Sequence, residues 1–481
     1  MKTAWIQGMA FVVLVSWTTR TSGGELSRPL PDQGLRSSRV AGSTDLDTYF
    51  LERFAFIFGP QDPGDWGLPD RAGPTRSATE LVREFQLSRD RLRPATVAAV
   101  ESMLARERAA YTYDTEHYRF SYDTEGVDAV PPDDTDGDGV PDYVENLGIY
   151  AEYAWQVEFE ELGFVAPKRS PAQGHRLHVI IQQMNAYGMT ICTGFCTIRI
   201  ENDFRGFGSN DDPDGPVAGA AKVTIAHELK HASQWETSNM TELGWIEVDA
   251  TWMEDVVYPE VNDYVQYVNS SESQVTTPSD PLDKWLYGSY PDVIWQISMS
   301  ERFGTGIIVD LWAYRAHHRA EGMLTSYDAI LRAYGTDLEA QFALDYMVRN
   351  YLTGARTPTV SDVPYYPDAE KFHEGPVMPL PVPARVEGEL PHLAGAFFEA
   401  GPDDDSRAPT VTLEADPEAV MAVSALLWSG AGGVTVRSAT MEAGVARLDL
   451  DVPWSRLDRL GLVVVNAERA APSTAYVLTV E

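Results

Sequence analysis

One short segment restricts the fold more than any other part of the sequence. The run 223–232, VTIAHELKHA, carries two histidines four residues apart within an apolar pattern of helical period, which predicts a helix over about 220–235. Side chains at i and i+4 share one face of a helix, so His227 and His231 can reach the same metal ion. A solvated helix with incidental histidines is the alternative, but the apolar neighbours predict a buried face, where unpaired histidines would be costly.

Glu228 directly follows the first histidine and is placed to take a proton from a metal-bound water. Zn²⁺ lowers the pKa of such a water to about 7, which makes hydroxide available near neutrality. The next residues limit the class of site: Gln234 and Thr237 stand where a metzincin would carry its glycine and third histidine. The third ligand must therefore come from elsewhere in the chain.

A second predicted helix, over about 245–257, offers that ligand. Its Glu247 lies 16 residues after the second histidine, which leaves room for a turn and an antiparallel return helix. Glu254 is seven residues further on and about 10 Å away along the helix axis, so the two carboxylates are not expected to bind one ion. We expect Glu247 to be the ligand, and Glu254 or Asp249 to orient a ligand histidine through its other ring nitrogen.

These two motifs, HELKH and WIEVDATWMED, together resemble a zinc peptidase of the gluzincin type. More widely, the chain is similar to secreted bacterial zinc metalloproteases that combine a helical N-terminal region, a strand like HYRFSY, an acidic calcium loop, the two motif helices and a β-rich tail. The resemblance spans roughly residues 45–480 and is most specific at 117–145 and 223–258. It implies an α+β fold with a gluzincin-like peptidase core.

The resemblance also implies a side-chain donor that stabilises the oxyanion during hydrolysis. Gluzincins often take it from a downstream helix, and Tyr287 and Tyr290 are the candidates here, each with simple packing as the alternative. One residue departs from the family pattern. Lys230 lies inside the HExxH motif, where such enzymes usually carry an uncharged residue, so it either points to solvent or weakens zinc binding by repulsion.

An acidic loop over residues 134–145 matches the twelve-residue EF-hand loop at every ligand position. The expected Ca²⁺ ligands are Asp134, Asp136, Asp138, the carbonyl of Val140, Asp142 and Glu145, and Gly139 makes the sharp turn. Prolines precede the loop, so we expect a single loop leading into a helix over 144–162 rather than a paired EF-hand. An acidic turn without metal is the alternative, but five close carboxylates would repel one another without a cation.

The N-terminus indicates export. A lysine, an apolar run over residues 5–17 and small polar residues predict a signal peptide, although a buried helix would fit the same run. In an exported chain, Cys192 and Cys196 around a glycine predict a small disulfide loop rather than a metal site. No later apolar run is long enough to span a membrane. We therefore expect a secreted, extracellular protein.

Composition adds one exclusion. With 72 Asp and Glu against 37 Lys and Arg, the net charge is −35, which disfavours nucleic acid and anionic membranes as partners. The expected organisation is a signal peptide (1–23), a helical N-terminal region that is either integral or a propeptide (24–115), a metallopeptidase domain (116–360), a proline-rich linker (361–384) and a C-terminal β-sandwich (385–481).

The sequence thus favours a secreted zinc endopeptidase with Zn²⁺ and Ca²⁺ and a protein or peptide substrate. Two alternatives stay open: a catalytically weak, calcium-stabilised binding or adhesion protein, and a zinc hydrolase acting on non-peptide amides or esters.

Overall fold

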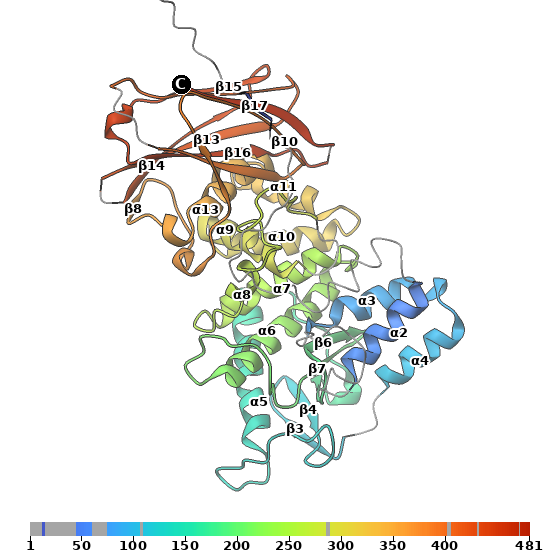
Figure 1. Cartoon of the computed structure of the whole chain (residues 1–481). Coiled ribbons are helices and arrows are strands. Elements are labelled where there is room, and N and C mark those ends of the chain that lie inside the picture. Colours follow the sequence, from blue (N-terminus) through green and yellow to red (C-terminus); the bar gives the residue numbers. More distant parts are fainter. Residues whose placement is uncertain are drawn as a thin grey trace, which may run out of the picture.

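The computed structural model describes residues 12–14, 45–59, 75–105, 109–284, 289–401, 406–430, 432–470 and 472–481. It contains both helices and sheets, which confirms the α+β prediction. In Figure 1 a C-terminal pair of sheets lies at one end, a helical layer follows, and the motif helices and a mixed sheet form the other half, with the N-terminal helices against its side. The expected signal peptide falls, apart from β1 (Val12–Leu14), on residues outside the described ones.

The N-terminal region forms the helices α2 (Leu46–Ile57), α3 (Thr79–Ser88) and α4 (Pro94–Leu104), close to the helices that the sequence predicts over 47–58, 78–87 and 96–109. Pro94 starts the third helix at a position where a missing N–H costs nothing. Their apolar residues share one buried cluster with Met184, Ala186 and Met189 of the following domain. The region is therefore packed onto that domain rather than folded apart from it.

A mixed sheet underlies the motif helices. Its strand order is β2 (Thr75–Ser77), β6 (Ala186–Cys192), β7 (Cys196–Ile200), β5 (Leu177–Ile181), β4 (Tyr118–Tyr122) and β3 (Tyr111–Asp114). The sequence predicts β4, β5 and β7 nearly at these bounds but not β2, β3 or β6. β2 pairs in parallel with β6, and β6 pairs with β7 as an antiparallel hairpin.

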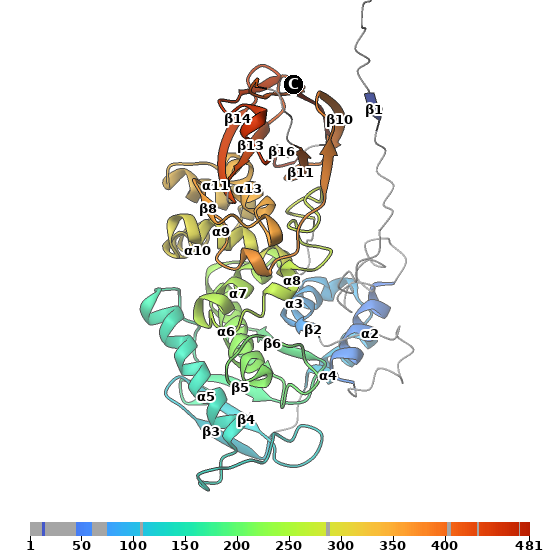
Figure 2. The ribbon, with the colours of Figure 1, turned by 60° about the vertical axis from the view of Figure 1, so that its left-hand side comes forward.

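The helices α5 (Asp142–Trp155) and α6 (Pro216–Thr237) lie next to this sheet, and α7 (Leu243–Val257) packs on α6 (Figure 2). α5 continues as a π-helical turn over Gln156–Glu161, at the end of the helix predicted over 144–162. α6 is buried around most of its surface because it packs against α5, α7, α10 and β6 at once. That burial on all faces explains why its sequence is apolar on more than one side.

A helical layer separates the motif helices from the C-terminal sheets. Its helices are α8 (Val265–Val268), α9 (Val293–Phe303), α10 (Gly306–His317), α11 (Met323–Ala333), α12 (Leu338–Gln341) and α13 (Met347–Tyr351), with a π-turn over Phe342–Tyr346. Aromatic side chains fill its core, for example Trp295 between Tyr327 and Tyr346. In the part of the chain that the structure describes, no helix is long and apolar enough to cross a membrane.

Two facing sheets end the chain (Figure 2), with a buried apolar cluster between them. One has the order β1–β10–β17–β12–β15 and the other β8–β14–β13–β16–β11–β9. The strands are β8 (Val360–Ser361), β9 (Val377–Leu380), β10 (Ala384–Leu390), β11 (Ala394–Ala400), β12 (Thr410–Ala415), β13 (Met421–Ser429), β14 (Gly433–Thr440), β15 (Val445–Asp449), β16 (Arg459–Asn466) and β17 (Thr474–Val480).

The proline-rich stretch 361–384 differs from the linker that its composition predicts. Tyr366, Ala369 and Phe372 are buried in the main core, and β9 pairs with β11. Pro379 lies in β9, which is an edge strand and therefore tolerates a residue without an N–H. The stretch joins the helical layer to the sheets as a packed element.

Candidate metal centre

α6 and α7 bring together the three residues that the sequence proposes as zinc ligands. A ring nitrogen of His227, one of His231 and a carboxylate oxygen of Glu247 all lie within 4.8 Å of one another. All three side chains are buried, with exposures of 1%, 0% and 0%. Two helices of different sequence position thus place three metal-binding atoms around one point.

The spacing of these atoms suits a tetrahedral ion. Nε2 of His227 lies 3.0 Å from Nε2 of His231 and 3.0 Å from Oε2 of Glu247, and Nε2 of His231 lies 3.4 Å from Oε1 of Glu247. Ligands about 2.0–2.1 Å from Zn²⁺ in tetrahedral geometry are about 3.3 Å apart. Oε1 of Glu247 has no hydrogen-bond partner among the described residues, as expected of an atom reserved for a metal. The residues present therefore fit zinc.

A carboxylate from the same helix as Glu247 orients the first histidine. Oε1 of Glu254 lies 2.6 Å from Nδ1 of His227, so Nδ1 donates its proton there and Nε2 faces the centre. Burial lowers the pKa of His227, but the hydrogen bonds to Glu247 and Glu254 outweigh it and raise that pKa well above its usual value. Burial likewise opposes ionisation of Glu247, yet the two imidazoles lower its pKa. Positive charge is thus favoured at the place where a metal ion would supply it.

Gln234 holds the second histidine, His231, whereas the sequence predicts that Glu254 or Asp249 orients a ligand histidine directly. Nδ1 of His231 lies 2.9 Å from Oε1 of Gln234, and Nε2 of Gln234 donates to Oδ2 of Asp249 at 2.7 Å. Asp249 therefore reaches the histidine only through Gln234. Sequence reasoning used Gln234 only to exclude a metzincin, although its position three residues after His231 on one helix is itself a signal of contact.

Lys230 does not point to solvent. Its exposure is 0%, and its Nζ lies 3.0 Å from the centre of the Phe164 ring and 3.5 Å from Oδ2 of Asp249. Burial lowers the pKa of Lys230, whereas Asp249 and Glu158 raise it. Glu158 lies in the π-turn after α5, and burial raises its pKa far above the usual value. The lysine charge is therefore balanced by the Asp249 carboxylate behind the centre.

Glu228 faces the sheet beside the histidines. Its Oε2 accepts hydrogen bonds from Oγ1 of Thr190 on β6 and from Oγ1 of Thr79 on α3, each at 2.8 Å, while Oε1 has no partner among the described residues. Gly188 permits this approach, because a Cβ there would lie 2.8 Å from both Cγ of Glu228 and Cγ2 of Thr224. The strand must carry glycine at this point for α6 to come so close.

Of the two tyrosines proposed as oxyanion donors, Tyr290 lies near the centre and Tyr287 falls outside the described residues. The ring of Tyr290 is 6.1 Å from that of His227, measured between centroids. Its hydroxyl accepts a hydrogen bond from the backbone N–H of Ser77 at 3.1 Å. The sequence did not suggest that any residue of β2 would reach this site.

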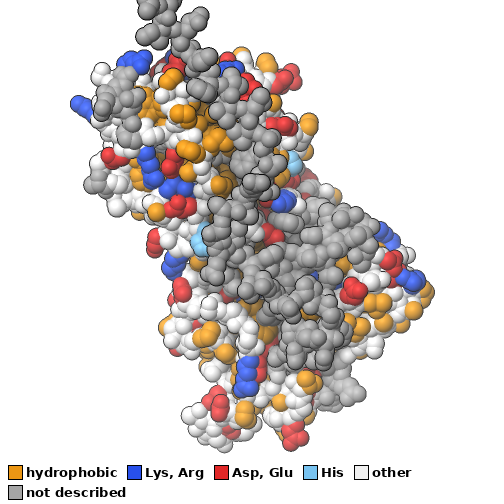
Figure 3. All heavy atoms as spheres, viewed as in Figure 1, with side chains coloured by type: hydrophobic (Ala, Val, Ile, Leu, Met, Phe, Trp, Pro, Cys, Tyr) orange, Lys and Arg blue, Asp and Glu red, His pale blue; other side chains and the backbone are white. Residues whose placement is uncertain are grey.

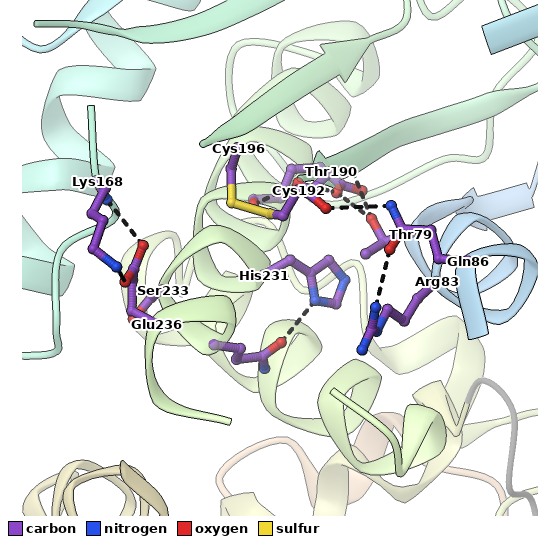
Figure 4. The surroundings of a disulfide bond; sticks show 12 residues. Thr79, Arg83, Gln86, Lys168, Thr190, Cys192, Cys196, His231, Ser233 and Glu236 are labelled. Atoms are coloured by element: carbon purple, nitrogen blue, oxygen red, sulfur yellow. Dashed lines mark hydrogen bonds and ion pairs between the residues drawn. A yellow bond between two sulfur atoms is a disulfide. The ribbon is translucent and has the colours of Figure 1, made fainter. Parts of the chain in front are cut away.

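The predicted disulfide between Cys192 and Cys196 is confirmed, and Figure 4 shows it close to His231 and to α3. It closes the β6–β7 hairpin, where the two cysteines are directly paired. Nε2 of Gln86 on α3 donates to the carbonyl of Cys192. The disulfide therefore stiffens the rim between the sheet and the N-terminal helices.

The acidic loop forms a second cluster, far from the histidines. Carboxylate oxygens of Asp134, Asp136 and Asp138 lie within 4.8 Å of one another, and all three residues are exposed. Oδ1 and Oδ2 of Asp134 accept from the N–H groups of Gly137 and Gly139, which gives the loop the wound shape of a cation site. Gly139 has φ +91°, a conformation that favours glycine.

The three other proposed calcium ligands have different surroundings. Asp142 accepts from the N–H and the hydroxyl of Thr135, which lower its pKa. Partial burial and then four neighbouring aspartates raise the pKa of Glu145. Val140 lies in the middle of the loop, where its N–H donates to Oδ1 of Asp138. The mutual repulsion of these carboxylates is what a bound cation would relieve.

Charge outside these sites follows no single patch on the face shown in Figure 3. Carboxylates of the described residues are spread over the upper and lower parts of the molecule, with lysines and arginines among them. Among the described residues, the charged side chains on this face therefore form no patch of a single sign.

Comparisons with known proteins leave the chain without a family. No protein-family model and no curated protein matches the sequence. Among solved structures, the pre-peptidase C-terminal domain of a collagenase from Bacillus anthracis is 8% identical, covering 23% of this chain and 98% of its own, with a TM-score of 0.20. PirA is 14% identical, covering 20% of this chain and 93% of its own, with a TM-score of 0.16. PliG, a periplasmic inhibitor of g-type lysozyme from Aeromonas hydrophila, is 10% identical, covering 22% of this chain and 97% of its own, with a TM-score of 0.12. Scores this low carry no argument about fold or function.

Proposed function

We propose that this chain is a secreted zinc endopeptidase of the gluzincin type. The observation that carries the proposal is the buried set of His227, His231 and Glu247, with the carboxylate of Glu228 next to it. A zinc ion held there would polarise the substrate carbonyl and lower the pKa of a water molecule.

The chain's own residues have distinct roles in this proposal. Glu228 takes the proton of the attacking water and delivers it to the leaving amine. The hydroxyl of Thr190 fixes the Glu228 carboxylate by its hydrogen bond to Oε2. Glu254 and Gln234 hold the ring planes of His227 and His231, so that both Nε2 atoms face the same point. Among the described residues, Tyr290 is the candidate for donating a hydrogen bond to the oxyanion.

A peptide substrate is favoured over other amides or esters because the site lies under β6, whose outer backbone groups pair, among the described strands, only with the three-residue edge strand β2. β6 passes directly over Glu228, and a strand can extend that sheet by backbone hydrogen bonds. The disulfide of the β6–β7 hairpin supports an oxidising, extracellular environment.

We further propose that loop 134–145 binds Ca²⁺ and stabilises the start of α5. Three aspartates with adjacent oxygens and a raised pKa at Glu145 support this part of the proposal.

The test combines metal analysis with a peptide assay. We expect one equivalent of zinc in the purified protein and turnover of casein or a fluorogenic peptide library. Glu228→Ala should retain zinc and lose at least 10²-fold in kcat, because general-base catalysis contributes about 10²–10⁴-fold. Absence of zinc, or unchanged turnover in that variant, would refute the assignment.

A further inference from the structure

A short piece of the N-terminal region lies on the strand that passes over the metal centre. β2 pairs with β6 in register, Thr75 with Ala186 and Ser77 with Gly188. The N–H of Thr75 donates to the carbonyl of Asn185, and the N–H of Ala78 donates to the carbonyl of Gly188, both at 2.9 Å. Without β2, β6 would be the edge of this sheet, and its free backbone groups would be a template for a peptide strand.

The same segment contacts the groups that would act on a substrate. The Thr79 hydroxyl donates to the general base Glu228, and the Ser77 backbone N–H donates to the hydroxyl of Tyr290. Exposures of 1% for Ser77 and 1% for Thr79 show that both are enclosed. An extended peptide therefore already occupies the space between the sheet edge and the metal centre.

Arg76 enters a pocket built for a cation. Its guanidinium forms ion pairs with Glu254 and, at 2.8 Å, with Asp263, whose side chains are 2% and 0% exposed. It also lies over the ring of Tyr187, 4.5 Å from its centre. Two buried carboxylates with no cation between them would repel each other and would be costly to keep ionised. Burial raises the pKa of Asp263 to about 6, and Arg76 opposes that rise.

The N-terminal helices hold this segment in place. α3 begins directly after β2, and its Gln86 is bonded to the β6–β7 hairpin. Met184 and Met189 pack into the core formed by these helices. Once the segment leaves, the backbone of β6 and these apolar side chains become available to another peptide.

We propose that residues 75–79 occupy the substrate cleft of the site, so that the intact chain is partly latent and turns peptides over below its full rate, and that the pocket filled by Arg76 selects a cationic side chain in substrates. This inference rests on the proposed peptidase function. It identifies the N-terminal region as an inhibitor of the site and peptides containing arginine or lysine as the substrate class.

The test weakens the segment within the zinc-loaded full chain. Arg76→Gln removes the cation, and Arg89→Gln is the matched control, because Arg89 is half-exposed on the surface and its ion pair is with the exposed Glu101. We expect Arg76→Gln to raise kcat/KM for an eight-residue fluorogenic peptide at least tenfold, and to speed hydrogen exchange of the Thr75 and Ala78 amides at least tenfold. Arg89→Gln should change neither quantity.

The pocket that Arg76 fills is tested in the Arg76→Gln variant. A peptide carrying one arginine should be cleaved at least tenfold faster than its glutamine analogue, and adding Asp263→Asn should remove that preference. Equal rates for the two peptides would overturn the pocket assignment. If Arg76→Gln fails to fold by circular dichroism, Thr79→Val tests the same cleft, since it removes only the Thr79 hydroxyl, which donates to Glu228 and accepts from the N–H of Thr190.

The outcomes distinguish a failure of the latency inference from a failure of the peptidase assignment. If zinc is bound and Glu228→Gln abolishes turnover, but Arg76→Gln changes neither rate nor exchange, the latency inference is refuted and the peptidase assignment stands. If exchange rises in Arg76→Gln and no turnover dependent on Glu228 follows, the peptidase assignment is refuted and the inference falls with it.

Discussion

The buried ion pair behind the metal centre allows a quantitative test of the structure. Nζ of Lys230 and Oδ2 of Asp249 are 3.5 Å apart, and both side chains are almost fully enclosed, at 1% and 0% exposure. With an effective dielectric constant of about 20, their attraction is about 5 kcal/mol. Removing both ions from water costs several kcal/mol each, so the pair as a whole adds little net stability.

Removing one partner should be far more damaging than removing both. Lys230→Met keeps the length of the side chain but leaves the Asp249 charge uncompensated, and we expect a loss of about 3–5 kcal/mol in the free energy of unfolding. In the double variant Lys230→Met/Asp249→Asn, the side-chain amide oxygen introduced at position 249 can still accept from Gln234, so stability should return to within about 1 kcal/mol of the parent. Burial already raises the pKa of Glu158 and favours its neutral form, so this third group is not left as an isolated charge.

The assay is urea unfolding at pH 7 with saturating zinc and calcium, followed by tryptophan fluorescence. Lys168→Met is the control, because Lys168 is 70% exposed and its ion pair with Glu236 should contribute less than about 1 kcal/mol. A Lys230→Met variant as stable as the control would refute the reasoning, since it would mean that no charge is balanced at this position. A double variant no more stable than Lys230→Met would refute the pairing with Asp249.

Three further predictions concern other parts of the molecule. Gly188→Ala should destabilise the protein by about 1–3 kcal/mol and lower peptide turnover, because the new Cβ would push α6 away from β6, whereas Gly401→Ala, with no atom within 4 Å of its Cβ, should change neither the urea midpoint nor the rate. Calcium at about 100 times its Kd should stabilise the parent by about 2.7 kcal/mol in thermal unfolding. Asp138→Asn should reduce this gain, whereas Asp133→Asn, which lies outside the ligand positions, should not. Equal gains in the two variants would contradict the proposed calcium loop. Burial and then the neighbouring carboxylates raise the pKa of Asp255 to about 7, above its unfolded value. The folded state therefore holds the extra proton between about pH 4 and 7, and the free energy of unfolding falls as the pH rises through this window. Asp255→Asn should reduce that fall by about 2 kcal/mol in urea unfolding at pH 5 and 8, and parallel pH profiles of the parent and the variant would refute the shift.

The parts of the site that the sequence predicts depend on short-range geometry. His227 and His231 share a helical face, and Glu247 and Glu254 follow on the next helix, so helical periodicity alone relates them. The cysteine pair brackets a single turn, which makes its disulfide equally readable. Each of these predictions needs only the rise and twist of one helix or the width of one hairpin.

The parts of the site that the sequence does not predict depend on how the strands pair in the sheet. β2 has three residues and β6 contains a glycine and a methionine at its centre, so neither shows the alternation by which strands are recognised. β2 is a strand because it pairs with β6, and β6 because it pairs with β2 and β7 and lies under α6, which are tertiary effects. The stretch 361–384 fails for the opposite reason: its prolines predict a linker, but they lie where no ladder N–H is needed, as Pro379 shows on an edge strand.

The contacts that the sequence predicts and those that it misses would also have different roles in the site. Within the site, contacts that span few residues are those that would hold a metal, such as the pair His227–Glu247 with a separation of 20. Contacts that span many residues are those that would control access to it: Thr79 reaches Glu228 across 149 residues, and Arg76 reaches Glu254 across 178. Glu254 belongs to both sets, because its Oε1 holds His227 and both of its oxygens accept from Arg76. The group that orients a metal ligand is thus also the group that holds the segment in the cleft, and a change that releases Arg76 removes one of the two side chains that fix the Glu254 carboxylate.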